Sequence, residues 1–155
     1  MSEDISRSDL AEKYFNEGAN CSQAVLAAFA DELGIEKDFA MRLASGFGGG
    51  VGRMREVCGA FSGLVLVENL KNGFSDSTDQ ETKNASFARI QQMAADFKEL
   101  SGGNSIICRE LLSGEKATAK DGQKKLSCAE IVRLAVEIAE KTSFFDKNFK
   151  KPLAK

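Results

Sequence analysis

Histidine is absent from the 155 residues of this chain. Without an imidazole group, the sequence excludes a Ser–His–Asp triad, a Cys–His couple and every metal site that uses histidine. Tryptophan is also absent, and proline occurs only once. Cysteine is present without any CxxC pair, at Cys21, Cys58, Cys108 and Cys128. The chemistry that remains to be considered is therefore that of separate thiols.

Long apolar runs are missing as well. The longest, residues 57–67, is interrupted by glycine and serine and is much shorter than the roughly 20 residues of a membrane span. The net charge of -2 provides no basic excess for binding nucleic acid or an anionic membrane. The acidic, polar N-terminus does not resemble a secretory signal. We therefore expect a cytoplasmic protein that binds neither nucleic acid nor membrane.

Apolar residues recur at helical spacing through most of the chain, and no segment has the pattern of a strand. This spacing predicts helices over residues 7–16, 22–33, 36–45, 55–71, 79–100 and 127–141, with one more helical turn after Cys108. Residues 116–125 read as a polar loop, and we leave open whether the tail, 144–155, docks. We expect a single all-α domain over residues 1–155, a bundle of about four principal helices.

Three cysteines lie at the expected starts of helices. Asn20 before Cys21 and Ser127 before Cys128 are each followed, three residues later, by Gln or Glu, as in a capping box. Cys108 heads the last short helical turn. The positive end of a helix dipole favours thiolate over thiol, so we expect the pKa values of Cys21 and Cys128 to lie below about 8.5.

Cys58 lies in an apolar segment, which we interpret as the interior of a helix. Burial there disfavours the thiolate, so its pKa should not be lowered. Considered alone, Cys58 fits a small buried core residue. An even number of cysteines in a cytosolic chain nevertheless favours a metal, a cluster or catalytic sulfur over structural disulfides.

A glycine-rich segment separates the helices predicted over 36–45 and 55–71. It contains Gly46, Gly48, Gly49, Gly50 and Gly52. The segment lacks the Lys-Ser/Thr pair of a phosphate loop, and no strand precedes it as in a Rossmann fold. Its N–H groups are candidates for binding an anion such as a cluster sulfide. Gly59 is a further candidate for the cofactor site, because a residue without a side chain lets another backbone come close. The alternative is a tight turn between packed helices.

The segment CGAFSG, from Cys58 to Gly63, resembles the central motif of the family named C_GCAxxG_C_C, a group of bacterial and archaeal proteins described as redox-active. The resemblance covers nearly the whole chain. In chain order it also includes Asn20 with Cys21, the segment ASGFGGGVGRM at 44–54, CRELL at Cys108, and Cys128 before the last amphipathic helix. The chain differs from the family name in one respect, since it has Cys-Gly-Ala where the name has Gly-Cys-Ala.

A related module occurs in the split-Soret class of multihaem cytochromes, where a helical bundle holds a two-iron iron–sulfur cluster. The resemblance implies an iron–sulfur cofactor, a 2Fe–2S cluster that can be lost in air, with Cys21, Cys58, Cys108 and Cys128 as its metal ligands. A protein of this kind would exchange electrons with a redox protein partner. Because the chain has no CxxCH segment, haem is excluded.

Three functions remain open at this point. The first is electron transfer or redox sensing through a cluster held by four thiolates, with N–H donors from the glycine-rich segment. The second is thiol–disulfide exchange, which needs only two close cysteines. The third is a structural zinc site on an interaction module, although zinc ligands usually come in local pairs. The cysteines could also be incidental to a helical protein without a cofactor. The sequence identifies no catalytic residue, and it leaves open both enzymatic activity and homo-oligomerisation.

Overall fold

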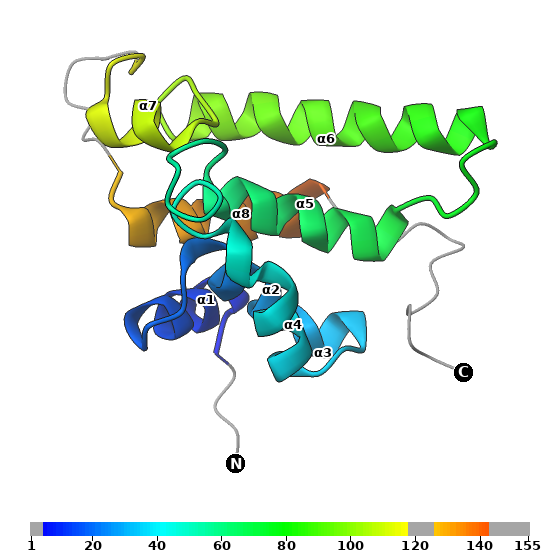
Figure 1. The fold of residues 1–155 in the computed structure, drawn as a ribbon, viewed down its shortest axis with the longest axis horizontal. Coiled ribbons are helices and arrows are strands. Elements are labelled where there is room, and N and C mark those ends of the chain that lie inside the picture. The colour runs from blue at the N-terminus through cyan, green and yellow to red at the C-terminus, as the bar shows by residue number, and fades with distance from the viewer. Residues whose placement is uncertain (1–4, 118–125, 143–155) are drawn as a thin grey trace.

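The structure, a computed structural model, describes residues 5–117 and 126–142 (Figure 1). Within these residues every regular element is a helix, and one isolated antiparallel bridge joins Val57 to Ile107. The helices are α1 (Arg7–Asn16), α2 (Cys21–Ala28), α3 (Ala30–Leu33), α4 (Lys37–Ala44), the short 3-10 helix η1 (Ser45–Phe47), α5 (Gly59–Asn72), α6 (Gln80–Leu100), α7 (Cys108–Ser113) and α8 (Cys128–Thr142). The predicted all-α class is confirmed.

Helix α2 lies at the centre of the packing. Its last five residues, 24–28, are all buried, so this short helix is apolar on every side. It packs against α1, α4, α5 and α8. Figure 1 shows α5 and α8 in the middle of the molecule, with α6 along one side and α1 to α4 along the other. A residue at the start of α2 can therefore meet residues that are far away in the sequence.

Two predicted helices have different bounds in the structure. The helix predicted over 22–33 is divided into α2 and α3, because the chain turns at Phe29, whose N–H group donates to the carbonyl of Leu26 at 3.0 Å. The helix predicted over 55–71 begins only at Gly59. Arg55 has a φ of 61° and Val57 forms the bridge to the segment before α7, so neither is helical. The other four predicted helices correspond to α1, α4, α6 and α8.

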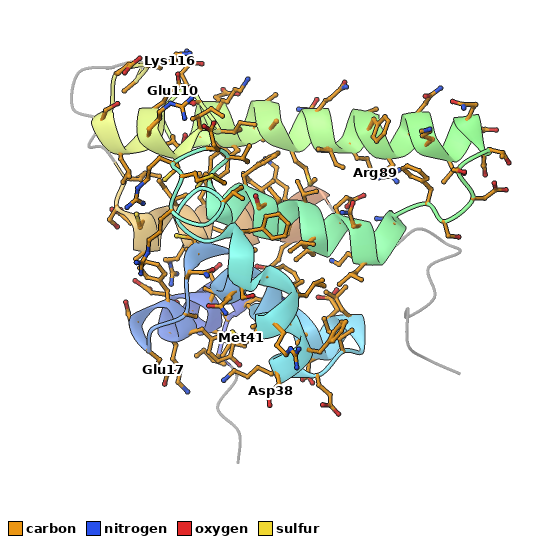
Figure 2. All side chains as sticks on the ribbon, viewed as in Figure 1. Glu17, Asp38, Met41, Arg89, Glu110 and Lys116 are labelled. Carbon is orange, nitrogen blue, oxygen red and sulfur yellow. The ribbon has the colours of Figure 1, made fainter. Side chains whose placement is uncertain are left out.

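Two contacts join α6 to α5. The rings of Phe61 and Phe97 meet edge to face, with their centroids 5.6 Å apart. Farther along, the Nε atom of Arg89 donates to the buried carboxylate of Glu68 at 2.6 Å, and Figure 2 shows Arg89 between the two helices. A buried carboxylate retains its charge only with such partners. These contacts fix the position of α5, and thus of Cys58 at its start.

The predicted loop over 116–125 lies mostly outside the described residues, and the predicted tail over 144–155 lies entirely outside them. Among the helices of the described part of the chain, none combines the length and the apolar character needed to cross a membrane.

Candidate functional site

All four cysteines line a single small cavity. Its volume is about 60 Å³, whereas one water molecule needs roughly 10–15 Å³. The cysteines come from four segments that are far apart in the sequence: Cys21 on α2, Cys58 just before α5, Cys108 on α7 and Cys128 on α8. No disulfide joins them. Much of the remaining wall is apolar, formed by Leu111, Leu112 and Ile131.

Each of the four cysteines lies at the beginning of a helix. The first residues of α2, α7 and α8 are Cys21, Cys108 and Cys128. The apolar pattern around Cys58 predicted a position inside a helix, which is wrong, because Cys58 is the N-cap residue of α5. Its sulfur accepts hydrogen bonds from the N–H groups of Phe61 and Ala60. Four helix N-termini, with their positive dipole ends and unpaired N–H groups, therefore meet at the cavity.

The antiparallel bridge holds Cys58 beside Cys108. The bridge pairs Val57 with Ile107, the residues just before the two cysteines. The N–H group of each cysteine donates to a carbonyl on the opposite segment, at 2.7 Å for Cys58 and 2.6 Å for Cys108. The fold thus sets the relative position of these two thiols.

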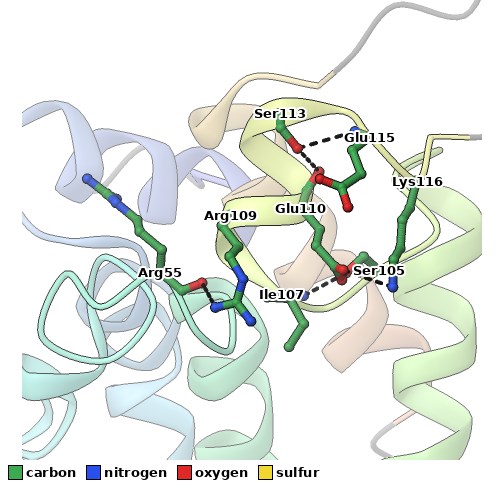
Figure 3. A network of polar contacts seen from close by, with 8 residues as sticks. All are labelled: Arg55, Ser105, Ile107, Arg109, Glu110, Ser113, Glu115 and Lys116. Carbon is green, nitrogen blue, oxygen red and sulfur yellow. Dashed lines mark hydrogen bonds and ion pairs between the residues drawn. The ribbon is translucent and has the colours of Figure 1, made fainter.

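The start of α7 is further held by a polar network (Figure 3). The Ser105 hydroxyl accepts from the N–H group of Ile107 at 2.9 Å and donates to the carboxylate of Glu110 at 2.6 Å. Lys116 forms an ion pair with Glu110 at 2.8 Å. The hydrogen bonds from Lys116 and Ser105 lower the pKa of Glu110, so this carboxylate stays charged at neutral pH. The network orients the turn that carries Cys108.

Cys21 and Cys128 form the second close pair. Their side chains are hydrogen-bonded to each other. This bond raises the pKa of the Cys21 thiol far above its ordinary value, and burial and the neighbouring thiols raise it further. The expected lowering of the pKa is therefore wrong for Cys21. At Cys21, the stabilisation of the thiolate by the helix terminus is outweighed, because two adjacent thiols cannot both ionise without strong repulsion.

The four thiols differ in exposure. Cys58 and Cys108 are buried, Cys21 is half-buried and Cys128 is exposed. Burial raises the pKa of Cys58 to about 11, and the N–H groups that cap its sulfur oppose this rise only in part. The expectation that Cys58 has no lowered pKa is confirmed. The cavity has a solvent side at Cys128 and a buried side at Cys58 and Cys108.

We expect the reduced, metal-free protein to react with iodoacetamide at Cys128 before it reacts at Cys58. Cys128 is exposed, whereas Cys58 is buried and forms the reactive thiolate only as the pH approaches about 11. Peptide-resolved mass spectrometry across a series of pH values measures this order. Equal labelling of the two cysteines in mildly alkaline solution would contradict the difference in burial.

The glycine-rich loop, residues 48–58, has an unusual backbone. Residues 49–53 all have φ values between 55° and 75°. Residues other than glycine adopt this left-handed conformation at a cost of roughly 1–2 kcal/mol each. Val51 and Arg53 adopt it nonetheless, alternating with glycines, and Arg55 does so as well. The left-handed turn is the physical reason for glycine at positions 49, 50 and 52.

Only some of the predicted cofactor-binding glycines reach the cavity. Gly49, Gly50 and Gly59 line it, whereas Gly46, Gly48 and Gly52 do not. A Cβ atom added to Gly50 would lie 2.7 Å from the Cβ atom of Cys108. One added to Gly59 would lie 3.3 Å from the Cβ atom of Cys21. Both glycines therefore let the backbone pack directly against a cysteine.

Most N–H groups of the loop are used by the loop itself. Those of residues 51–56 donate to carbonyls of residues 46–51. Within the described loop, the N–H groups of Gly49 and Gly50 donate to no backbone carbonyl, and both residues line the cavity. The prediction that N–H groups of the loop bind an anion therefore applies only to Gly49 and Gly50.

Arg55 is a cavity residue that the sequence analysis did not identify. Its guanidinium group donates to the sulfur of Cys108 at 3.9 Å. Its carbonyl accepts from the backbone and the side chain of Arg109, at 3.1 and 3.2 Å (Figure 3), which helps to hold the left-handed conformation. The feature of the sequence that indicated this position was a basic residue three positions before Cys58. The wall residues Leu111 and Leu112 likewise follow Cys108 at helical spacing.

Among the described residues, no group of three or more His, Cys, Asp or Glu side chains is arranged to hold a metal ion. The thiols instead surround a cavity; two of them are buried, Cys21 is half-buried and Cys128 is exposed.

One comparison with known proteins gives a result. The family model described as "Putative redox-active protein (C_GCAxxG_C_C)" matches residues 19–142, a stretch that contains all four cysteines. Neither the curated proteins nor the solved structures give a match.

Proposed function

We propose that this chain, which belongs to the C_GCAxxG_C_C family of putative redox-active proteins, holds a two-iron iron–sulfur cluster with its four cysteines and serves in electron transfer or redox sensing. The observation that carries the proposal is that cysteines from four separate segments line one cavity. In the described part of the chain, these thiols are accompanied at the cavity by one charged group, Arg55, and by apolar side chains.

The donor set fits such a cluster chemically. Four thiolates are the usual ligands of a 2Fe–2S cluster, and a chain without histidine cannot form a Rieske-type site, so we expect a low reduction potential. When bound, the cluster would supply reversible one-electron transfer. Cys21, Cys58, Cys108 and Cys128 would be its ligands.

Other groups of the chain would adjust the properties of these thiolates. The N–H groups of Phe61 and Ala60 at Cys58, and the guanidinium of Arg55 at Cys108, place hydrogen-bond donors on the two buried sulfurs. Such donors stabilise negative charge on sulfur and raise a reduction potential. The apolar wall, which includes Ile131, limits the access of water to the same sulfurs.

A single zinc ion is a weaker candidate for the site. A tetrahedral zinc site needs four sulfurs about 2.3 Å from one point, and no ready-made ion site occurs among the described residues. Thiols that are spread around a cavity are better suited to a group with several atoms.

A second candidate function is thiol–disulfide exchange at Cys21 and Cys128. Their mutual hydrogen bond and the exposure of Cys128 favour it. In this reaction, the thiolate of Cys128 would attack a disulfide of a substrate and release one substrate thiol. Cys21 would then attack the mixed disulfide, so that the protein pair is oxidised and the substrate is reduced to two thiols. This function needs neither Cys58 nor Cys108.

Anaerobic purification followed by visible spectroscopy and by iron, sulfide and zinc assays tests the proposal. We expect visible charge-transfer bands with about two iron atoms and two sulfides per chain. A colourless, metal-free protein would contradict the cluster and favour the dithiol reaction. One zinc atom per chain without sulfide would contradict both.

A further inference from the structure

A row of exposed apolar side chains follows α4 and η1. Phe39, Leu43 and Phe47 are four residues apart and are 48%, 39% and 36% exposed. This spacing places them on one face of the helix. An adjacent face of α4 carries Ala40 and Ala44, which are fully buried against the rest of the fold. The apolar row is therefore an outer face that the described fold does not cover.

The apolar row ends at the cysteine site. A Cβ atom added to Gly59 would lie 3.0 Å from the carbonyl oxygen of Phe47 and 3.3 Å from the Cβ atom of Cys21. The backbone of Phe47 therefore lies close to Cys21. Beyond this point Met54 is 63% exposed, and Leu112 is exposed at the wall of the cavity. Figure 1 shows the glycine-rich loop, which carries Met54, between α4 and α7.

The same surface is basic in a chain that is acidic overall. Residues 39–55 contain Arg42, Arg53 and Arg55 but no Asp or Glu. Within the described residues, none of these three arginines forms an ion pair with a carboxylate. All three are exposed. The positive charge of Arg42 and Arg53 is thus available to a partner, whereas Arg55 also donates to the sulfur of Cys108.

The neighbouring carboxylates do not cancel this charge. Glu56 pairs with Arg109 at 3.1 Å, and Glu110 pairs with Lys116. Asp38 is one helical turn from Arg42, but no ion pair joins the two among the described residues, and Asp38 lies at the end of α4 far from the loop (Figure 2). The acidic groups at the edges are therefore either paired with a cation or distant from the cavity.

We propose that this surface, formed by the exposed side chains of residues 39–55 together with Leu112, docks an acidic redox protein and brings it to the cysteine cavity. The inference rests on the proposed redox function and adds the chemistry of the partner. A centre of exposed apolar side chains with charged residues around it is typical of protein interfaces. Complementary charge accelerates the encounter and orients the partner. Small interfaces, below about 1,200 Å², are common among redox partners.

Equilibrium binding with two probes of opposite charge tests this proposal. The probes are an acidic plant-type ferredoxin and a basic cytochrome c, each titrated against the immobilised chain as purified. We expect binding of the ferredoxin alone, weakened as salt shortens the Debye length from about 10 Å at 0.1 M to about 3 Å at 1 M. The double variant Arg42→Glu/Arg53→Glu should weaken this binding at least tenfold.

The matched control is Lys13→Glu/Lys98→Glu, which makes the same change in net charge at exposed positions on α1 and α6. We expect it to change the affinity less than threefold. Hydrogen exchange of the bound complex should show protection in residues 39–56 and 108–113. The proposal would be overturned if the ferredoxin did not bind or if both double variants lost affinity equally. Hydrogen-exchange protection in other parts of the chain would overturn it as well.

Protection of residues 39–56 that depends on protein concentration without any probe would also overturn it, because a second copy would then cover the surface. The measurement detects docking and not electron transfer. It therefore gives a result whether or not the chain contains iron, and its failure is distinct from failure of the cluster proposal.

Discussion

Replacing any one of the four cysteines by serine is expected to reduce the iron and sulfide content to less than about a tenth of the wild-type value. Even the loss of groups that only support a metal ligand typically costs about 10–100-fold in metal affinity. The most informative variants are Cys58→Ser and Cys108→Ser, because both thiols are buried and neither is needed for a Cys21–Cys128 disulfide. Iron, sulfide and visible absorbance after anaerobic purification measure the effect.

Ser127→Ala is the matched control for Cys128→Ser. The Ser127 hydroxyl accepts from the N–H group of Glu130 at 3.2 Å, so this variant removes the cap of α8 beside the site. We expect it to lower the free energy of unfolding by about 1 kcal/mol and to retain iron. If Cys58→Ser and Cys108→Ser retain both redox activity and wild-type metal content, the cluster proposal is wrong and the dithiol reaction is favoured.

Gly50→Ala is expected to destabilise the protein by at least about 2 kcal/mol and to release the cluster. A Cβ atom at this position would lie 2.7 Å from the Cα atom of Arg55 and 2.7 Å from the Cβ atom of Cys108. Its φ of 75° adds the cost of a left-handed conformation for a residue with a side chain. Chemical denaturation of the metal-free protein and the iron content of the purified protein measure the two effects separately.

Two other glycines, Gly52 in the loop and Gly46 in η1, serve as controls. A Cβ atom on Gly52, with a φ of 55°, would meet no atom within 4 Å, so Gly52→Ala should cost only the conformational term of about 1–2 kcal/mol. Gly46 has neither a positive φ nor a neighbour within 4 Å, so Gly46→Ala should be nearly neutral. If alanine at positions 46, 50 and 52 lowered stability and iron content equally, the close contact between Gly50 and Cys108 would not explain the effect at position 50.

Local signals in the sequence were sufficient for two of the four cysteine positions. Asn20 and Ser127 cap α2 and α8 as their capping boxes predicted, because a cap depends only on residues within one helical turn. The helix periodicity was equally local, which explains why α1, α4, α6 and α8 begin and end close to their predicted bounds.

The position of Cys58 could not be predicted in this way. Its segment has the apolar spacing of a helix, but Val57 pairs instead with Ile107, about 50 residues away in the sequence. The pKa of Cys21 depends in the same way on Cys128, which only the packing of α2 against α8 brings near. Such long-range contacts leave no trace in a single local window.

The glycine-rich loop was recognised by composition but not by conformation. The density of glycine indicated close approach of backbone, which the structure places at Gly50 and Gly59. The left-handed turn was not apparent from the sequence, because Val51 and Arg53 disfavour that conformation. Strain of this kind is usually concentrated at functional sites, which agrees with the position of the loop at the cavity.

The most direct test of a shared cluster is iron X-ray absorption spectroscopy of the anaerobically purified protein. The account predicts a first coordination shell made only of sulfur, together with an iron–iron vector, because four thiolates and bridging sulfides would supply every ligand and the chain has no histidine. The same shell should be lost in Cys58→Ser and Cys108→Ser as well as in Cys21→Ser and Cys128→Ser. Bound iron with a mixed oxygen and sulfur shell, and with no iron–iron vector, would contradict a cluster shared by the four cysteines.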